Sequence, residues 1–175
     1  ELQSLGVQVR PGPHALQYAQ DKLDMRKKLS EAGVPCPLWA QLENEADLDA
    51  FTDKAGYPFV LKTARGGYDG KGVWVIDTRE DALKVMGLII DSNTRILAEE
   101  LVPFIRELSA QVARSPQGQC VAYPVVQSLQ TNGICHEVIS PAPDLDETRS
   151  AEAQHIALTI ANALDVHLSL IHISE

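Results

Sequence analysis

The chain has 175 residues, 45% of them apolar, with a formal net charge of −9 and a pI near 5.0. An acidic chain without a basic stripe is a poor candidate for binding nucleic acid or an anionic membrane, and no apolar run approaches the ~20 residues of a membrane span. Three widely separated cysteines indicate neither a disulfide framework nor a zinc site, so we expect buried, reduced thiols in a cytoplasmic protein.

The first helical pattern covers residues 12–37. Its apolar residues fall on two faces, so the segment is either one helix buried on both sides or two helices, the second capped by Asp21. Gly33 followed by Pro35 ends the pattern. Asn44 is then a candidate N-cap for a helix that ends at Gly56.

Residues 57–99 predict a compact β–β–α–β unit. Strand-like runs cover residues 57–63, 72–77 and 94–99, and Thr78 caps the helix between the last two. The predicted inner face of this helix consists of Ala82, Leu83, Met86, Ile89 and Ile90.

The later part of the chain adds three β-like runs and one helix. The runs cover residues 104–114, 120–126 and 134–139. Asp144 and Glu147 resemble a capping box, and the helix that follows turns three residues inward, namely Ile156, Ile160 and Leu164. The mixture of helices and strands makes α+β the predicted fold class.

The segment VLKTARGGYDGKGVWVI, residues 60–76, is rich in glycine. It is not a Walker loop, because glycine follows its GK pair where Ser or Thr is needed, and it is not a Rossmann loop, because it leads into a strand. Asp69-Gly70 is a strong hairpin signal, so an ordinary turn is one interpretation. The other is a loop whose amides approach a phosphate, since so many glycines carry an entropy cost. Lys62, a charge within an apolar strand, favours the second interpretation.

Four segments carry a resemblance: AQDKL, VLKTARGGYDGKG, AEELVPFIRELS and YPVVQSLQTNGIC with the later PAPD. They resemble the ATP-grasp fold and, more narrowly, the family of 5-(carboxyamino)imidazole ribonucleotide synthetases, the ATP-dependent carboxylases of de novo purine synthesis. The GGYDGKG loop is the most specific of these motifs. The resemblance covers nearly the whole chain and implies a partial ATP-grasp fold, with a small β–β–α–β lid subdomain and the start of the larger subdomain.

The resemblance also implies domain boundaries. Residues 1–13 would end a domain that precedes the ATP-grasp unit, and residues 14–56 would form a helical linker region. Residues 57–128 would be the lid subdomain and residues 129–166 the start of the C-terminal ATP-grasp subdomain. We expect residues 167–175 to be a tail outside the family.

The resemblance further implies an ATP site. Lys22 would lie near the phosphates, Lys62 would contact phosphate and the adenine side, Glu107 would hold the ribose hydroxyls, and Gln130 would contact the nucleotide. The loop over the β- and γ-phosphates would comprise Gly67, Tyr68, Asp69, Gly70, Lys71, Gly72 and Val73. The adenine-recognising hinge would comprise Glu99, Glu100, Leu101 and Val102.

Three of these residues, Lys71, Tyr68 and Asp69, are the implied catalytic residues, and the last two would meet the aminoimidazole substrate. The implied reaction transfers phosphoryl from ATP to bicarbonate and then passes the carboxyl group of carboxyphosphate to 5-aminoimidazole ribonucleotide. The cofactors would be ATP and magnesium, and the full-length protein would be a homodimer. The family's metal ligands would lie beyond Glu175, so we expect no metal ligand and no activity from this chain alone.

Two alternatives remain open from the sequence. One is another ATP-grasp ligase, like biotin carboxylase or formate-dependent glycinamide ribonucleotide transformylase, although Tyr68-Asp69 argue against these. The other is a non-catalytic nucleotide-binding module. In each case we expect Lys62 to point into a cleft and face residues 99–102, and the loop at residues 65–71 to be the most mobile internal segment without nucleotide.

Overall fold

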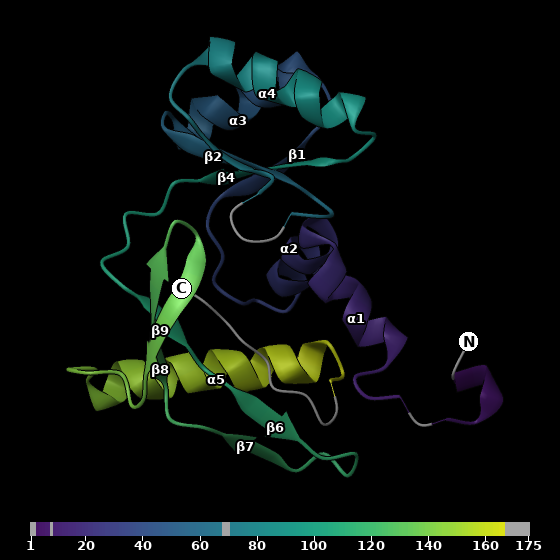
Figure 1. Cartoon of the computed structure of the whole chain (residues 1–175), viewed down its shortest axis with the longest axis vertical. Coiled ribbons are helices and arrows are strands. Elements are labelled where there is room, and N and C mark those ends of the chain that lie inside the picture. The colour runs from purple at the N-terminus through teal and green to yellow at the C-terminus, as the bar shows by residue number, and fades with distance from the viewer. Residues whose placement is uncertain (1–2, 8, 68–70, 167–175) are drawn as a thin grey trace. The chain divides into compact units, whose positions relative to one another are not determined.

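The computed structural model describes residues 3–7, 9–67 and 71–166 (Figure 1). The chain forms two compact units. One contains Ala19–Ser30 and Pro35–Pro103, and we call it the sheet unit. The other contains Glu1–Tyr18, Glu31–Val34 and Phe104–Glu175, and we call it the α5 unit. The domain boundaries implied by the family resemblance stay a prediction.

The sheet unit is built on four antiparallel strands in the order β1-β4-β2-β3. Their bounds are β1 Trp39–Leu42, β2 Phe59–Thr63, β3 Val73–Ile76 and β4 Ile96–Glu100. The three strands predicted between residues 57 and 99 are therefore confirmed, but β1 was missed. Its four residues, WAQL, are too few for alternation to show, and only Leu42 is fully buried.

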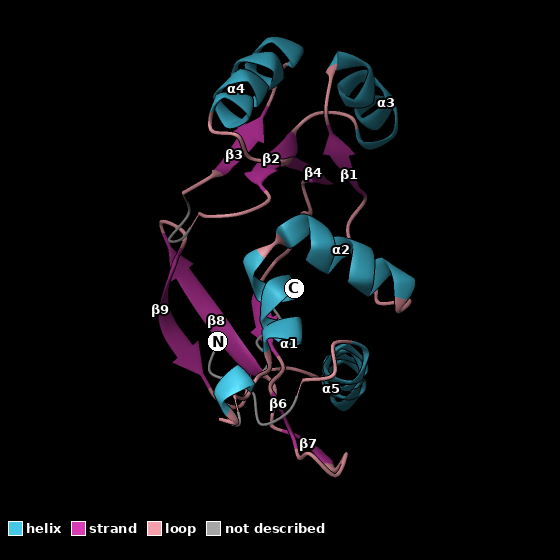
Figure 2. Cartoon of the chain, turned by 90° about the vertical axis from the view of Figure 1, so that its right-hand side faces the viewer, coloured by secondary structure: helices cyan, strands magenta, loops and turns pink. Residues whose placement is uncertain are grey.

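Helices α3 (Glu45–Ala55) and α4 (Arg79–Asp91) cover one face of this sheet (Figure 2). Asn44 caps α3 in a capping box with Asp47, and Thr78 caps α4, as predicted. The core between sheet and helices contains Leu48, Phe51, Phe59, Leu61, Ile76, Met86 and Ile89. Ile90 was wrongly placed on the inner face, because it lies one position past the buried Ala82–Met86–Ile89 stripe and is exposed.

The helical pattern at the start of the chain forms two helices, which is one of the two alternatives left open by the sequence. Helix α1 covers Pro13–Gln20 and helix α2 covers Lys22–Glu31, after a short 3-10 turn, η1, at Gln3–Leu5. Asp21 lies between the helices, and its Oδ1 accepts hydrogen bonds from the amides of Leu23 and Asp24, each at 3.2 Å. The side chain is thus the N-cap of α2. The part of the chain that the structure describes contains no helix long and apolar enough to cross a membrane.

The α5 unit contains two small antiparallel sheets and one long helix. The first sheet has the order β5-β8-β9 and the second pairs β6 with β7. The strand bounds are β5 Glu107–Ser109, β6 Val112–Arg114, β7 Cys120–Ala122, β8 Val126–Thr131 and β9 Ile134–Ile139. Helix α5 covers Glu147–Ala163 and buries Ala153, Ala157, Ile160 and Ala161.

Three sequence-based assignments in this unit need correction. The run at residues 104–114 is two strands, because the consecutive buried residues Ser109 and Ala110 interrupt the alternation of a single strand. The run at 120–126 ends early, and β8 was not recognised as a separate strand. The cap of α5 is Asp146, which accepts from the amide of Arg149, whereas Asp144 adopts a positive φ of 52° in the preceding turn. The expectation of buried thiols is also wrong in this unit, since Cys120 and Cys135 are exposed on β7 and β9. The α+β class itself is confirmed.

Candidate functional site

The face of the sheet opposite α3 and α4 carries two predicted charged residues, Lys62 of β2 and Glu99 of β4. The strand register places Trp39, Glu99, Val60 and Val75 in one row across this face. The next row contains Gln41, Leu97, Lys62 and Val73. Helix α2 packs over the β1–β4 side through a cluster of Leu23, Leu97, Ala64 and Trp39. The β3 side stays exposed at its two valines, so we call this surface the open face.

Lys62 and Glu99 meet at the centre of the open face. The Lys62 Nζ donates to Glu99 Oε2, and Arg26 Nε of α2 donates to Glu99 Oε1. The Glu99 side chain is only 3% exposed, whereas Lys62 and Arg26 are each 26% exposed. A buried carboxylate therefore holds two cations whose remaining surface is open to solvent. The expectation that Lys62 faces Glu99 is confirmed, while the cleft expected around Lys62 stays a prediction.

The electrostatics of Glu99 follow from these contacts. Burial alone would raise the pKa of the Glu99 carboxyl, but the hydrogen bond from Arg26 and the charge of Lys62 outweigh it. The pKa consequently lies below the usual glutamate value, and Glu99 is ionised at neutral pH. The carboxylate fixes two positive charges beside the uncovered valines of β3.

Lys22 brings another positive charge to the loop that follows β2. Its backbone amide donates to Ala64 O at 2.8 Å and its Nζ donates to Gly66 O at 3.0 Å. Burial and the nearby charge of Lys62 lower the pKa of Lys22, partly offset by Asp21 and Glu99. A lysine of lowered pKa close to another lysine indicates a surface where an anion would be stabilised.

Steric crowding explains why glycine occupies two positions of the loop. Gly67 and Gly72 have φ of +77° and +74°, a region that favours glycine. A Cβ on Gly67 would lie 2.4 Å from Lys71 O, and one on Gly72 would lie 2.6 Å from Thr63 Oγ1. The ends of the loop are therefore too close together for side chains. Thr63 Oγ1 is buried at this point and accepts or donates no hydrogen bond within the described residues.

The remaining predicted residues of the sheet unit lie around the same face or just beyond it. Val73 on β3 is exposed, and so are Leu101 and Val102 after the end of β4. Glu100 accepts a hydrogen bond from the Leu38 amide at 3.0 Å, so its side chain ties β4 to the segment before β1. Lys71 is exposed. Three predicted loop residues, Tyr68, Asp69 and Gly70, lie outside the described residues.

Two predicted residues, Glu107 and Gln130, belong to the α5 unit. Glu107 begins β5 opposite Ser128 of β8. Its Oε2 is buried and has no hydrogen-bond partner among the described residues. Gln130 is exposed on β8, at the register irregularity between β8 and β9. A buried carboxylate oxygen without a donor is costly, so Glu107 is an acceptor that a polar ligand could satisfy.

Sequence reasoning missed several residues that the structure brings into the site. Arg26 lies one helical turn after Lys22, and this spacing is a signal that could have identified it. Arg65 and Arg95 both reach the buried Asp21, from the loop and from the residue before β4. Their separation in sequence hides this contact, because only the sheet topology brings residues 21, 65 and 95 together.

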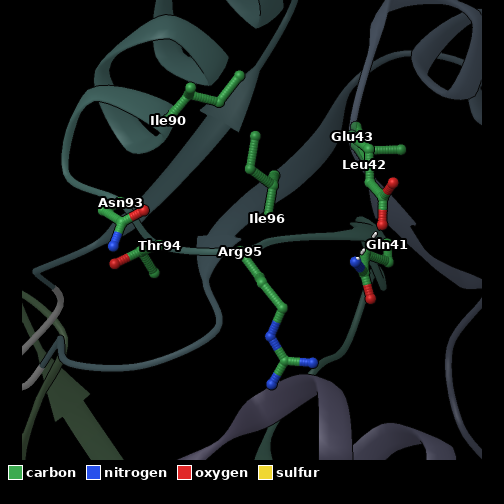
Figure 3. Close-up of a pocket in the computed structure, with 8 residues that line it drawn as sticks. All are labelled: Gln41, Leu42, Glu43, Ile90, Asn93, Thr94, Arg95 and Ile96. Atoms are coloured by element: carbon green, nitrogen blue, oxygen red, sulfur yellow. Dashed lines mark hydrogen bonds between the residues drawn. The ribbon is translucent and has the colours of Figure 1, made fainter.

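A pocket of about 340 Å³ lies elsewhere on the sheet unit, beside the end of α4 (Figure 3). It is lined by Gln41, Leu42, Glu43, Ile90, Asn93, Thr94, Arg95 and Ile96. Its charged residues are already engaged, since Glu43 accepts from Gln41 and Arg95 binds Asp21 and Asp24. The open face, where cations gather around a buried carboxylate, is the better candidate site.

Comparison with known proteins identifies the family of this chain. Residues 27–167 match the model of the ATP-grasp domain. The chain is 45% identical over 161 residues to the N5-carboxyaminoimidazole ribonucleotide synthase of Mycobacterium bovis, an alignment that covers 92% of this chain and 38% of that protein. The chain thus spans well under half the length of this relative.

Solved structures give the same result. The N5-carboxyaminoimidazole synthetase of Staphylococcus aureus complexed with ADP matches with a TM-score of 0.80 at 29% identity, over 93% of this chain and 42% of that chain. The N5-carboxyaminoimidazole ribonucleotide synthetase of Thermus thermophilus matches with a TM-score of 0.84 at 27% identity, over 98% of this chain and 48% of that chain. The partial ATP-grasp fold expected from the sequence is confirmed.

Proposed function

The chain belongs to the ATP-grasp family, and from this membership we propose that its open face binds ATP for the carboxylation of 5-aminoimidazole ribonucleotide. The single observation that carries the proposal is the Lys62–Glu99–Arg26 cluster on the open face. It presents two fixed cations beside exposed valines, next to a glycine loop. An amphipathic ligand with an apolar ring and a polyanionic tail fits such a surface.

The two rows of the open face suggest how ATP lies on it. Val75 shares a row with Val60 and Glu99, and its exposed side chain offers an apolar surface for adenine. Lys62 lies one row closer to the loop, where Lys22 holds Gly66 O. We therefore place adenine toward residues 99–102 and the phosphates toward Lys62 and Lys22.

The side chain of Glu99 acts in this proposal through the cations that it orients. Both of its carboxylate oxygens already accept from Arg26 and Lys62. Contacts to the adenine edge are assigned to backbone groups at Glu99, Glu100, Leu101 and Val102, three of which lie at or beyond the end of β4. Backbone donors and acceptors suit a heteroaromatic edge.

Glu107 is proposed to accept hydrogen bonds from the ribose hydroxyls. Support comes from its buried Oε2, which lacks a donor among the described residues. A ribose diol offers two donors to a carboxylate. Gln130 is proposed as a further nucleotide contact because its side chain is exposed on β8.

The proposed reaction has two steps. An oxygen of bicarbonate attacks the γ-phosphorus of ATP, and the bond to the ADP oxygen breaks to give carboxyphosphate. The exocyclic amine of 5-aminoimidazole ribonucleotide then attacks the carboxyl carbon, loses a proton and expels phosphate. Lys62, Lys22 and loop amides would stabilise the negative charge on the transferred group. Tyr68 and Asp69 are proposed to meet the second substrate, and Lys71 is proposed as a catalytic residue of the loop over the phosphates.

The finer assignments that accompany this function are also proposals. Magnesium would enter bound to ATP, as the counter-ion of its phosphates. Among the described residues no group of three His, Cys, Asp or Glu side chains could hold a metal ion, so no step is assigned to a metal held by this chain. A homodimeric full-length protein and a cytoplasmic location complete the proposal.

Titration of the 175-residue chain with ATP and magnesium tests the nucleotide part. We expect saturable binding that Lys62→Met weakens about tenfold or more, because a charge-assisted contact is lost. Lys84→Met is the matched control, since Lys84 pairs only with exposed carboxylates on α4. No binding at millimolar ATP, or equal effects of the two substitutions, would reject the proposed site.

The carboxylation part is tested by the second substrate. The chain saturated with ATP should bind 5-aminoimidazole ribonucleotide, whereas glycinamide ribonucleotide and biotin should not compete. Binding of biotin or glycinamide ribonucleotide instead would favour another ATP-grasp ligase. Binding of ATP with none of these compounds would favour a nucleotide-binding module without this chemistry.

A further inference from the structure

We propose that Asp21 is a positioning residue that anchors the start of the glycine loop and Lys22 for phosphate binding. The inference rests on the proposed function, because it concerns how the phosphate side of that site is held. Asp21 itself is fully buried, and its side chain faces away from solvent. It would act only through the residues that it binds.

Asp21 joins three separate segments of the sheet unit. Its Oδ1 accepts from the amides of Leu23 and Asp24 at the start of α2. Its Oδ2 accepts from Arg65 Nε at 2.6 Å and from Arg95 Nη2 at 2.5 Å. Arg65 directly precedes the loop glycines, and Arg95 directly precedes β4. One oxygen of this carboxylate therefore caps α2, and the other binds the loop and the start of β4.

The backbone repeats the same connection. The Lys22 amide donates to Ala64 O at 2.8 Å, and the Ala64 amide donates to Arg95 O at 2.9 Å. The first residue of α2, the residue before Arg65 and the residue before β4 are thus bonded in series. Figure 3 shows the Arg95 side chain running away from Ile90 and Ile96, on the side opposite the core.

These contacts fix the two groups that the phosphates would meet. Because Asp21 caps α2, the helix begins at Lys22, whose Nζ then reaches Gly66 O at 3.0 Å. Because Asp21 holds Arg65, the chain enters Gly66 and Gly67 from a defined position. Loss of the anchor would free the lysine and the loop together, while the core between β2, β4 and the helices would keep its packing.

The anchor needs a carboxylate rather than an amide. Burial would raise the pKa of Asp21, but hydrogen bonds from Arg65, from the Asp24 amide and from Arg95 lower it below its usual value. Asparagine keeps an oxygen for the helix cap but carries no charge for two guanidinium groups. Asp21→Asn therefore separates the cap from the anchor.

The test compares Asp21→Asn with Asp49→Asn, a matched control whose carboxylate makes an exposed ion pair with Arg79. ATP and adenosine are titrated into each 175-residue variant and followed by amide NMR. Hydrogen exchange is measured without nucleotide at the Lys22 and Ala64 amides, which donate to Ala64 O and Arg95 O, and in β2. We expect Asp21→Asn to weaken ATP about tenfold or more, leave adenosine unchanged and accelerate exchange at the Lys22 and Ala64 amides but not in β2. Asp49→Asn should match the wild type in all three.

The other outcomes overturn the proposal. Wild-type exchange and ATP affinity in Asp21→Asn would show that the loop needs no anchor. Equal losses of ATP and adenosine, with faster exchange throughout β2, would show a general structural role. If Asp21→Asn does not fold, Arg65→Gln removes only the loop side of the anchor and must accelerate exchange at the neighbouring Ala64 amide. If the wild type binds neither ligand, the proposed function fails while the exchange data still decide the anchor.

Discussion

Lys62 of β2 and Glu99 of β4 form an ion pair across neighbouring strands, on the face of the sheet that α3 and α4 do not cover. Arg26 completes the cluster from α2. Buried carboxylates of this kind gain little stability from their charge alone, because desolvation offsets the attraction. We therefore propose that Glu99 serves to hold the cations of Lys62 and Arg26 in place for a ligand.

The first prediction concerns stability at acidic pH. The pKa of Glu99 is lower in the folded state than its ordinary value of 4.5, so its ion pairs stabilise the fold fully above that pH. The contribution is lost as pH falls below 4.5 and through the lowered pKa of the folded state. Glu99→Gln should therefore show a shallower decrease in the free energy of unfolding over this acidic range.

Urea unfolding at several pH values measures this difference through tryptophan fluorescence. The two tryptophans of the chain, Trp39 and Trp74, both belong to the sheet unit, so the signal reports on that unit. Identical pH profiles for the wild type and Glu99→Gln would contradict the assignment of an ionised, paired Glu99.

A second prediction separates two neighbouring glycines. Gly66 and Gly67 have φ of +69° and +77°, so alanine at either should cost about 1 kcal/mol of conformational strain. Only at Gly67 would the new Cβ meet a backbone atom, Lys71 O at 2.4 Å. Gly67→Ala should thus lose more stability and more ATP affinity than Gly66→Ala. Equal behaviour of the two variants would mean that the closeness of the loop ends does not matter.

A third prediction concerns the ribose. If Glu107 accepts from the ribose hydroxyls, Glu107→Gln should weaken ATP by about tenfold, the value of a hydrogen bond to a charged group. The same substitution should barely affect 2′,3′-dideoxy-ATP, which has no hydroxyls to donate. Calorimetric titrations of both nucleotides into both proteins give the comparison. A similar loss for both nucleotides would remove Glu107 from the ribose contact.

Much of the fold could be predicted because its signals are local. Asn44, Thr78 and Asp21 were recognised as caps from residue type and spacing, and the strands around the glycine loop from their apolar, β-rich composition. Boundaries failed where the signal was short or interrupted, as in β1 and at Ser109. The shared face of Lys62 and Glu99 could not be derived from spacing alone, because it depends on the pairing of β2 with β4.

The residues of the candidate site also divide into those with a local sequence signal and those that depend on tertiary structure. Lys62 was identified as one charge within an apolar strand, and the family resemblance supplied Lys22 and the segment at residues 99–102. Arg26 had only its helical spacing from Lys22 as a signal and Arg95 had none, because each arginine binds a carboxylate brought close by tertiary structure. The sheet topology determines which distant residues form ion pairs, so these pairs cannot be predicted from their positions in the sequence.

The most direct test of the open face as an ATP site is an amide NMR map of the 175-residue chain titrated with ATP and magnesium. We expect the largest shifts at Lys22, Lys62, Gly66, Gly67, Val73 and residues 99–102. The amides of α3 on the covered face should change little. Shifts confined to the pocket around Glu43 and Asn93, or no shifts at millimolar ATP, would contradict the assignment of the open face.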